Sequence, residues 1–346
     1  MCRDRMFADM DIPEHIKENL AAVGNHGLAK GTWSSYKTAE KMLLMCRKER
    51  GGKVSIPLSK EGVMILIDWM ITERGLKAST ISSYLAGIRQ LHILKGMEVN
   101  ELRSERVKLV LRGKKNIDNA KKRAGGDKGR LPMTLTMMKI LKERLRRWKE
   151  DDREKLLVWT VASLAFHGAF RIGELLCTQE TNFDPAYTLL TEDISTSGED
   201  LTAGEPVTVL TVRLKCPKEQ RDGRAVLVDV YQSGGPICPV RAFQKWAARA
   251  QLEKGQPLFR RDCGTPLTGR KMNVYLHELM GDIAREKGGK LTSHSFRIGI
   301  ASTLGAKGFS DEEIKAAGRW GSSAFEVYLK LPRTRRMAIA RKIGQL

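Results

Sequence analysis

Four separated segments in the second half of the chain carry residue types that suit phosphate chemistry. FRIGELL contains Arg171 and Glu174, LKCPKEQ contains Lys215 and Lys218, SHSFRIG contains His294 and Arg297, and GRWGSSAFEVYLK contains Trp320 and Tyr328. A guanidinium presents a fixed, always charged fork of donors that matches phosphate oxygens. A tyrosine hydroxyl, with an ordinary pKa of about 10, is a weak nucleophile that needs help at neutral pH. Each residue alone has an ordinary structural explanation, but their joint occurrence favours one shared site.

The order of these elements resembles that of the tyrosine recombinase family. The pattern is Arg-x-x-Glu-Leu, a hairpin lysine, His-x-x-Arg, Gly-x-Trp and a final tyrosine, and it spans residues 171–328. The stretch STISSYLAGIRQLH, residues 79–92, also looks like a helix of the family's core-binding domain. The resemblance implies a mainly helical fold with a small β-sheet, in which a helical core-binding domain and an α+β catalytic domain form a C-shaped DNA clamp.

The resemblance also implies a role for each residue. Tyr328 would attack the scissile phosphate, displace the 5′-hydroxyl and form a 3′-phosphotyrosyl intermediate. Arg171 and Arg297 would hold the non-bridging oxygens and stabilise the negative charge of the transition state. His294 would act as acid–base partner and phosphate contact, and Trp320 would donate an indole N–H to the phosphate.

The remaining two roles are supporting ones. Lys218 is the expected general acid for the leaving oxygen because it aligns with the lysine of the family's hairpin turn. Lys215 remains the alternative, since Pro217 replaces a small polar residue of the family pattern. Glu174 is expected to orient Arg171 or His294. The phosphotyrosyl bond conserves the energy of the phosphodiester, so the resemblance implies neither a nucleotide cofactor nor a metal.

These roles imply a site-specific recombinase or integrase that cleaves and rejoins double-stranded DNA. Phrases such as CPVRAFQKW and IKAAGRWGSSAFEVYLKLPR look like recombinases of eukaryotic DIRS-like and Crypton-like mobile elements. We therefore expect integration of a mobile element, and the nucleus as location in a eukaryote or the cytoplasm and nucleoid otherwise. A homotetramer on DNA, with a dimer at each site, is expected to assemble through a C-terminal helix.

Three alternatives stay open from the sequence. A type IB topoisomerase shares the chemistry, a domesticated recombinase would bind DNA without cleaving it, and a metal-dependent integrase would need a strand-rich core near its carboxylates. The apolar stripe in PRTRRMAIARKIGQL, which includes Met337 and Ile343, favours recombination because it could dock on a neighbouring protomer.

The composition agrees with a nucleic-acid-binding protein. The 346 residues suffice for two domains, and a formal net charge of +21 favours a polyanionic partner. The six cysteines are scattered without a C-x-x-C pair, so a zinc site or a disulfide framework is not expected. A secretory signal is not expected, because the N-terminal MCRDRMFADMDIPEH lacks an apolar core. A membrane span is not expected either, because the longest apolar stretch, residues 156–170, is short and interrupted by polar residues.

The first 115 residues are predicted to form the helical core-binding domain. Helical stripes run through residues 33–46, 61–74 and 79–92, the third with Ser79 or Thr80 as N-cap and Gly96 as its stop. A last helix is expected from about Ser104 towards Lys115. Residues 116–130 are predicted to be a basic linker lying across a DNA backbone. Its candidate DNA contacts, counted from the end of that helix, are Arg112, Lys114, Lys115, Lys121, Lys122 and Arg123.

Residues 131–346 are predicted to form the catalytic domain. Helices are expected at about 135–150, 153–168 and 171–177. Alternation of apolar and polar residues at 210–215 and 226–230, with a turn holding Pro217 and Gly223, then indicates a β-hairpin. Helical periodicity returns after Pro239, and Ser310 and Glu313 are predicted to form a capping box.

Overall fold

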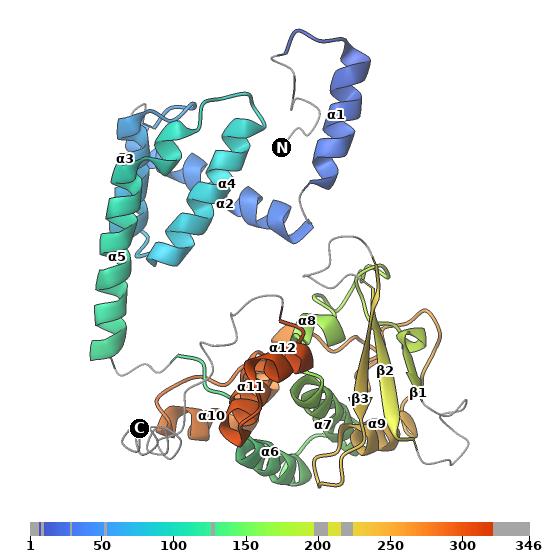
Figure 1. Cartoon of the computed structure of the whole chain (residues 1–346). Helices are drawn as coiled ribbons and strands as arrows, with labels where there is room; N and C mark the ends of the chain where they lie inside the picture. Colours follow the sequence, from blue (N-terminus) through green and yellow to red (C-terminus); the bar gives the residue numbers. More distant parts are fainter. Residues whose placement is uncertain are drawn as a thin grey trace, which may run out of the picture. The chain divides into compact units, whose positions relative to one another are not determined.

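The protein is described by a computed structural model (Figure 1). The structure describes residues 7, 10–27, 30–51, 54–125, 129–196, 207–215 and 224–320. The chain divides into two compact units, Met1–Gly126 and Asp127–Leu346. Each unit has its own apolar core.

The first unit is helical, as predicted. Its helices are α1 (Glu14–His26), α2 (Lys30–Arg50), α3 (Lys60–Thr72), α4 (Ala78–Ile93) and α5 (Glu105–Ala124), with a short 3-10 helix at Asn100–Arg103. The stripe predicted on α4 is confirmed, because Ile81, Leu85 and Ile88 are buried in the core between α2, α3 and α4. His92 ends the stripe buried, with one ring nitrogen on the Ile88 carbonyl and the other accepting from the Leu58 amide.

The boundary of α5 differs from our prediction. We expected a helix ending near Lys115 and a linker over 116–130, but α5 is helical to Ala124. Asp118 explains the difference, because it pairs with Lys114 one turn earlier and accepts from the Ala78 amide at 2.8 Å. That bond also corrects the predicted cap of α4, since a carboxylate on another helix takes the place of Ser79 or Thr80. A lack of apolar period does not end a helix that is fixed by such a tertiary contact.

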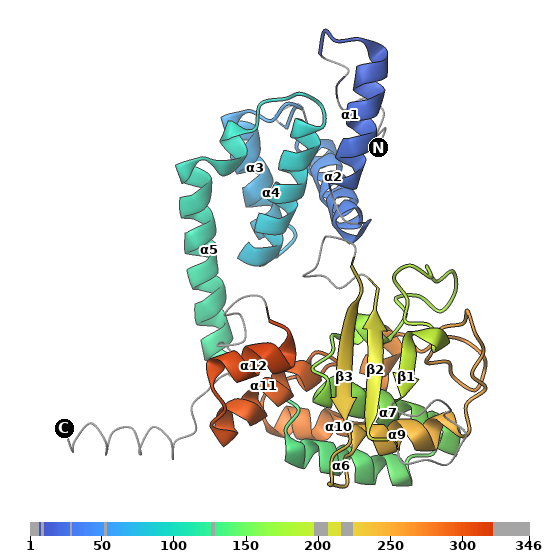
Figure 2. The same cartoon turned by 45° about the vertical axis from the view of Figure 1, so that its right-hand side comes forward.

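The second unit surrounds one long buried helix. Its elements are α6 (Leu135–Arg147), α7 (Asp152–His167), α8 (Ile172–Leu175), a 3-10 turn (Thr191–Asp193), β1 (Ile194–Thr196), β2 (Val209–Leu214), β3 (Val226–Tyr231), α9 (Pro239–Ala247), α10 (Gly269–Glu286), α11 (Ser295–Lys307) and α12 (Asp311–Gly318). Helix α7 packs against α6, α9 and α11 (Figures 1 and 2). It matches the helix expected at about 153–168 and carries most of the long apolar stretch, whose side chains are buried.

The predicted hairpin is confirmed. Strands β2 and β3 pair antiparallel, with Leu210 opposite Val230, Val212 opposite Val228 and Leu214 opposite Val226, so the predicted apolar positions share one face. Strand β1, which the sequence analysis missed, adds a third strand in the order β1-β2-β3. With only three residues it has too little alternation to be recognised. The hairpin turn, 216–223, lies outside the described residues.

The end of the described chain is a well-capped helix. Ser310 and Glu313 form the predicted capping box of α12, each accepting from the other's backbone amide. Gly318 is the last helical residue, and Arg319 turns the chain with a left-handed backbone, φ +52°. Across the helices that the structure describes, none is both long and apolar enough to cross a membrane.

Candidate active site

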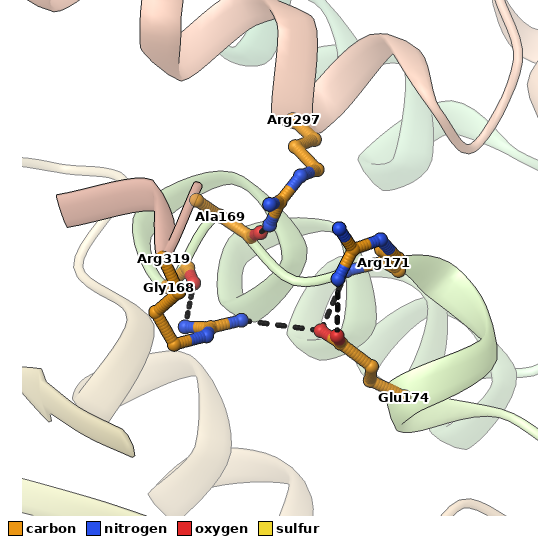
Figure 3. A network of polar contacts seen from close by, with 6 residues as sticks. All are labelled: Gly168, Ala169, Arg171, Glu174, Arg297 and Arg319. Carbon is orange, nitrogen blue, oxygen red and sulfur yellow. Dashed lines mark hydrogen bonds and ion pairs between the residues drawn. The ribbon is translucent and has the colours of Figure 1, made fainter. Parts of the chain in front are cut away.

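Two arginines that lie far along the sequence from the loop between α7 and α8 both contact this loop. Arg297 donates to the carbonyl of Ala169, and Arg319 donates at 2.8 Å to the neighbouring carbonyl of Gly168 (Figure 3). Gly168 must be small, because a Cβ there would lie 2.2 Å from the Phe170 ring. The same ring lies 4.8 Å from the Arg319 guanidinium, an arrangement that suits a cation–π contact.

Arg171 follows this loop and caps α8. Its amide donates to Glu174 Oε2 at 2.9 Å, and its guanidinium donates to Oε1 at 3.0 Å. Arg319 contacts the same carboxylate at 3.1 Å. Glu174 thus contacts Arg171, one of the two residues that we expected it to orient, and links it to Arg319 (Figure 3). The Arg171 side chain keeps 27% exposure, so it is both fixed and accessible.

Arg297 lies inside the protein at 2% exposure. Such a charge is costly to bury unless polar and aromatic partners compensate it. Besides the Ala169 carbonyl, it has the ring of Trp320 at 4.5 Å from its guanidinium carbon. Trp320 is half-buried and also packs on Ala301 and Ile314, so it joins α11 to the end of α12.

His294 stands at the start of α11, half-buried and surrounded by cations. Burial lowers its pKa below the ordinary value, and the charges of Arg130, Arg297 and Arg171 lower it further. The imidazole is therefore neutral at pH 7. A neutral imidazole can accept a proton or donate a hydrogen bond, and an incoming phosphate would favour its protonation.

Two cations of this site were not predicted from the sequence. Arg130 was assigned to the linker, but its segment runs along residues 290–295 through the bonds Leu131 N to Lys290 O and Met133 N to Ser295 O, both 2.9 Å. Gly299 permits this approach, because a Cβ there would lie 1.9 Å from the Met133 carbonyl oxygen. Arg319 is the unspecified residue x of the Gly-x-Trp motif. Its position between Gly318 and Trp320 was the feature of the sequence that could have indicated its place in the site.

Of the two candidate general acids, Lys215 and Lys218, the structure describes only Lys215. The Lys215 ammonium contacts the buried carboxylate of Asp193 at 2.6 Å and the carbonyls of Pro185 and Thr188 at 3.0 and 3.3 Å. Its three N–H donors thus have three acceptors, which is the pattern of a structural lysine. Lys215 and Glu174 line the same small cavity of about 40 Å³, so the residue that follows β2 lies beside α8. Lys218 and Tyr328 lie outside the described residues.

Other predicted residues belong to the first unit or do not join the site. Of the expected DNA contacts on α5, Lys114 is held by Asp118, whereas Arg112, Lys115, Lys121 and Lys122 are exposed. The Arg123 side chain lies outside what the structure describes.

Tyr275, another tyrosine of the second unit, does not join the site. It is buried at 1% exposure and bonded to Glu154, and burial together with this bond raises the pKa of its phenol well above the usual range.

Comparison with solved structures identifies the fold. The XerH site-specific recombinase bound to a palindromic difH substrate matches with a TM-score of 0.52 and 13% identity, over 82% of this chain and 70% of that chain. A lambda integrase dimer bound to a COC′ core site matches at 0.52 and 14%, over 94% and 79%. The Tn1549 transposon integrase with transposon right end DNA matches at 0.54 and 16%, over 90% and 93%.

These similarities define the fold, which is that of the tyrosine recombinases: mostly helical, with a small three-stranded antiparallel sheet. No protein-family model matches the sequence, and no curated protein matches it.

Gly318 is predicted to be essential for the position of Trp320. A Cβ on Gly318 would lie 1.6 Å from the Trp320 ring, so Gly318→Ala must displace the indole from Arg297. We expect a loss of stability of about 1–3 kcal/mol, typical of overpacking, and a shifted Trp320 indole N–H resonance. Gly173→Ala is the matched control, because open space surrounds its Cβ position. Equal thermal stability and unchanged spectra for both variants would contradict the predicted steric role.

The second prediction concerns the cations around His294. An NMR titration of the free protein should give His294 a midpoint below the ordinary value of about 6.5. Arg130→Gln removes a neighbouring positive charge and should move the midpoint upward. His167 is the internal control, since burial lowers its pKa without a contribution from Arg130. A His294 midpoint at or above 6.5, or one unmoved by the substitution, would refute the clustering.

Proposed function

We propose that this protein is a site-specific DNA recombinase that cleaves and rejoins strands through a 3′-phosphotyrosyl intermediate. The observation that carries the proposal is the convergence of Arg171, His294, Arg297 and Trp320 in a tyrosine recombinase fold. Guanidinium groups held in advance by the protein stabilise developing phosphate charge without reorganisation during the reaction. DNA as substrate is supported by the high net positive charge and by the DNA complexes of the structural neighbours.

In the proposed reaction, the Tyr328 oxygen forms a bond to phosphorus as the bond to the 5′-oxygen breaks. Arg171 and Arg297 hold the non-bridging oxygens, and His294 accepts the proton that the Tyr328 hydroxyl loses and returns it to the tyrosine oxygen when the strand is rejoined. The chain enters residues 321–346 directly from Trp320, which lies on Arg297, so Tyr328 follows eight residues from the site. This short connection supports Tyr328 as the nucleophile over the exposed Tyr187 and Tyr231.

Lys218 is proposed to protonate the leaving 5′-oxygen. The occupied donors of Lys215 support this choice, because a general acid must have an N–H available to the substrate. Lys215, three residues before Lys218 in the sequence, lines a cavity together with Glu174 of α8, which supports the reach of Lys218 to a phosphate held by Arg171.

We further propose that the recombinase integrates a mobile element of the DIRS-like or Crypton-like kind, in the nucleus if the host is eukaryotic. It would work as a homotetramer on DNA, joined through the apolar stripe near the C-terminus, with the exposed cations of α5 contacting the backbone. The recombinases and integrases among the structural neighbours favour strand exchange over the topoisomerase alternative.

The central test is a covalent adduct. The protein is incubated with a pool of nicked duplexes of randomised sequence, denatured, and examined for protein–DNA adducts whose peptide is mapped by mass. We expect an adduct at Tyr328 that disappears in Tyr328→Phe, which removes one oxygen and little volume. Tyr231→Phe, a change at an exposed residue of β3, should leave the adduct intact.

An adduct mapped to another tyrosine, or one that persists in Tyr328→Phe, would overturn the assignment. Intact DNA binding without any adduct from the unmutated protein would favour the domesticated, non-cleaving alternative.

Substrates with a 5′-thiol leaving group test the lysine, because a thiolate leaves without protonation. Lys218→Ala should slow cleavage of ordinary DNA by roughly a hundredfold or more and cleavage of the thiol substrate far less. Lys215→Ala is the control and should harm both substrates alike, since it removes the partner of buried Asp193. Equal effects of Lys218→Ala on both substrates would show that Lys218 is not the general acid. If the thiol substrate instead restored cleavage by the Lys215→Ala variant, the general acid would be Lys215.

A further inference from the structure

Besides the candidate active site, the second unit contains a strongly basic cavity of about 500 Å³ between α6, α7 and α9. Its cationic lining residues are Lys142, Arg146, Lys155, Arg241, Lys245 and Arg249. Apolar side chains, among them Leu145, Leu156 and Trp159, form the rest of the wall. None of these residues belongs to the candidate active site, and in both views α6 and α9 lie together at the lower edge of the unit (Figures 1 and 2).

Like charges are concentrated in this cavity. Burial lowers the pKa of Lys142, and the charges of Arg146, Lys245 and Arg241 lower it further. Two carboxylates offset part of the charge, since Asp152 pairs with Lys155 at 3.0 Å and Glu143 with Arg146 at 2.8 Å. The cations still outnumber the carboxylates, and a bound anion would relieve the repulsion.

Two of the cations are held in place by backbone acceptors. Lys142 donates to the Pro236 carbonyl and lies 5.4 Å from the centre of the Trp159 ring. Arg241 donates to the carbonyls of Ser233, at 3.4 Å, and Gly235. Fixed side chains lose less conformational entropy when a ligand binds, so these contacts prepare the cavity for an anion.

We propose that the cavity binds an organic polyphosphate of nucleotide size. Its volume falls in the range of small-molecule sites, its cations suit several phosphate groups, and its apolar wall suits an organic moiety. The chain's own C-terminal segment, residues 332–346, does not fit, because it carries five arginines and lysines and no acidic residue. Duplex DNA is too wide to enter such a cavity.

The test is calorimetric titration of ATP, without divalent cations, into the full chain saturated with duplex DNA, which covers the DNA-binding cations. We expect one ATP per chain. Lys245→Gln combined with Arg249→Gln should weaken binding at least tenfold, because both exposed residues line the cavity. Arg285→Gln combined with Lys287→Gln is the control of equal charge; these exposed residues at the end of α10 lie outside the cavity and should change the affinity less than twofold.

Several outcomes would overturn the proposal. If bound DNA abolished ATP binding, the ATP would be binding at the protein's DNA-binding surface. Equal losses of ATP affinity in the two double variants would show a nonspecific charge effect. Inorganic triphosphate binding as tightly as ATP would remove the role of the apolar wall. Tighter binding of an acidic decapeptide would identify a protein segment as the ligand instead.

Discussion

The second unit depends on the burial of one guanidinium. Arg297 is enclosed by the protein, and an enclosed charge requires fixed partners. The Ala169 carbonyl supplies one, and the Trp320 ring supplies another. These requirements determine the backbone of the loop between α7 and α8, and they bring the end of α12 against α11. Two glycines beside the site, Gly168 and Gly318, follow from the space that the neighbouring aromatic rings occupy.

Further cationic side chains lie near this arginine, and the carboxylate of Glu174 contacts two of them. Glu174 contacts both Arg171 and Arg319, while Arg130 and Arg171 act on His294. Such an arrangement is unfavourable in the free protein, and a phosphodiester would stabilise it. Burial and these neighbouring charges lower the pKa of His294, and a phosphate bound at this site would favour protonation of the imidazole.

Helix α7 connects the two basic regions of the unit. Near its start, Lys155 and Trp159 line the basic cavity between α6, α7 and α9, and at its end the Gly168 carbonyl accepts from Arg319. The helix is buried along most of its length, so it is a rigid element between the two. Because the candidate active site and the cavity use different side chains, they can be altered independently by mutation.

The sequence by itself determined the helical first unit, the β-hairpin and the α12 cap, because the periodicity and capping that indicate them are local properties of a few neighbouring residues. It also indicated Arg171, Glu174, His294, Arg297 and Trp320 through their spacing. The extent of α5, the cap of α4, the short strand β1 and the membership of Arg130 and Arg319 in the site were decided by tertiary structure. Asp118 caps a helix forty residues away, and Arg319 reaches carbonyl and carboxylate groups about 150 residues earlier. Such contacts leave no periodic pattern in the sequence, since they depend on how separate elements pack.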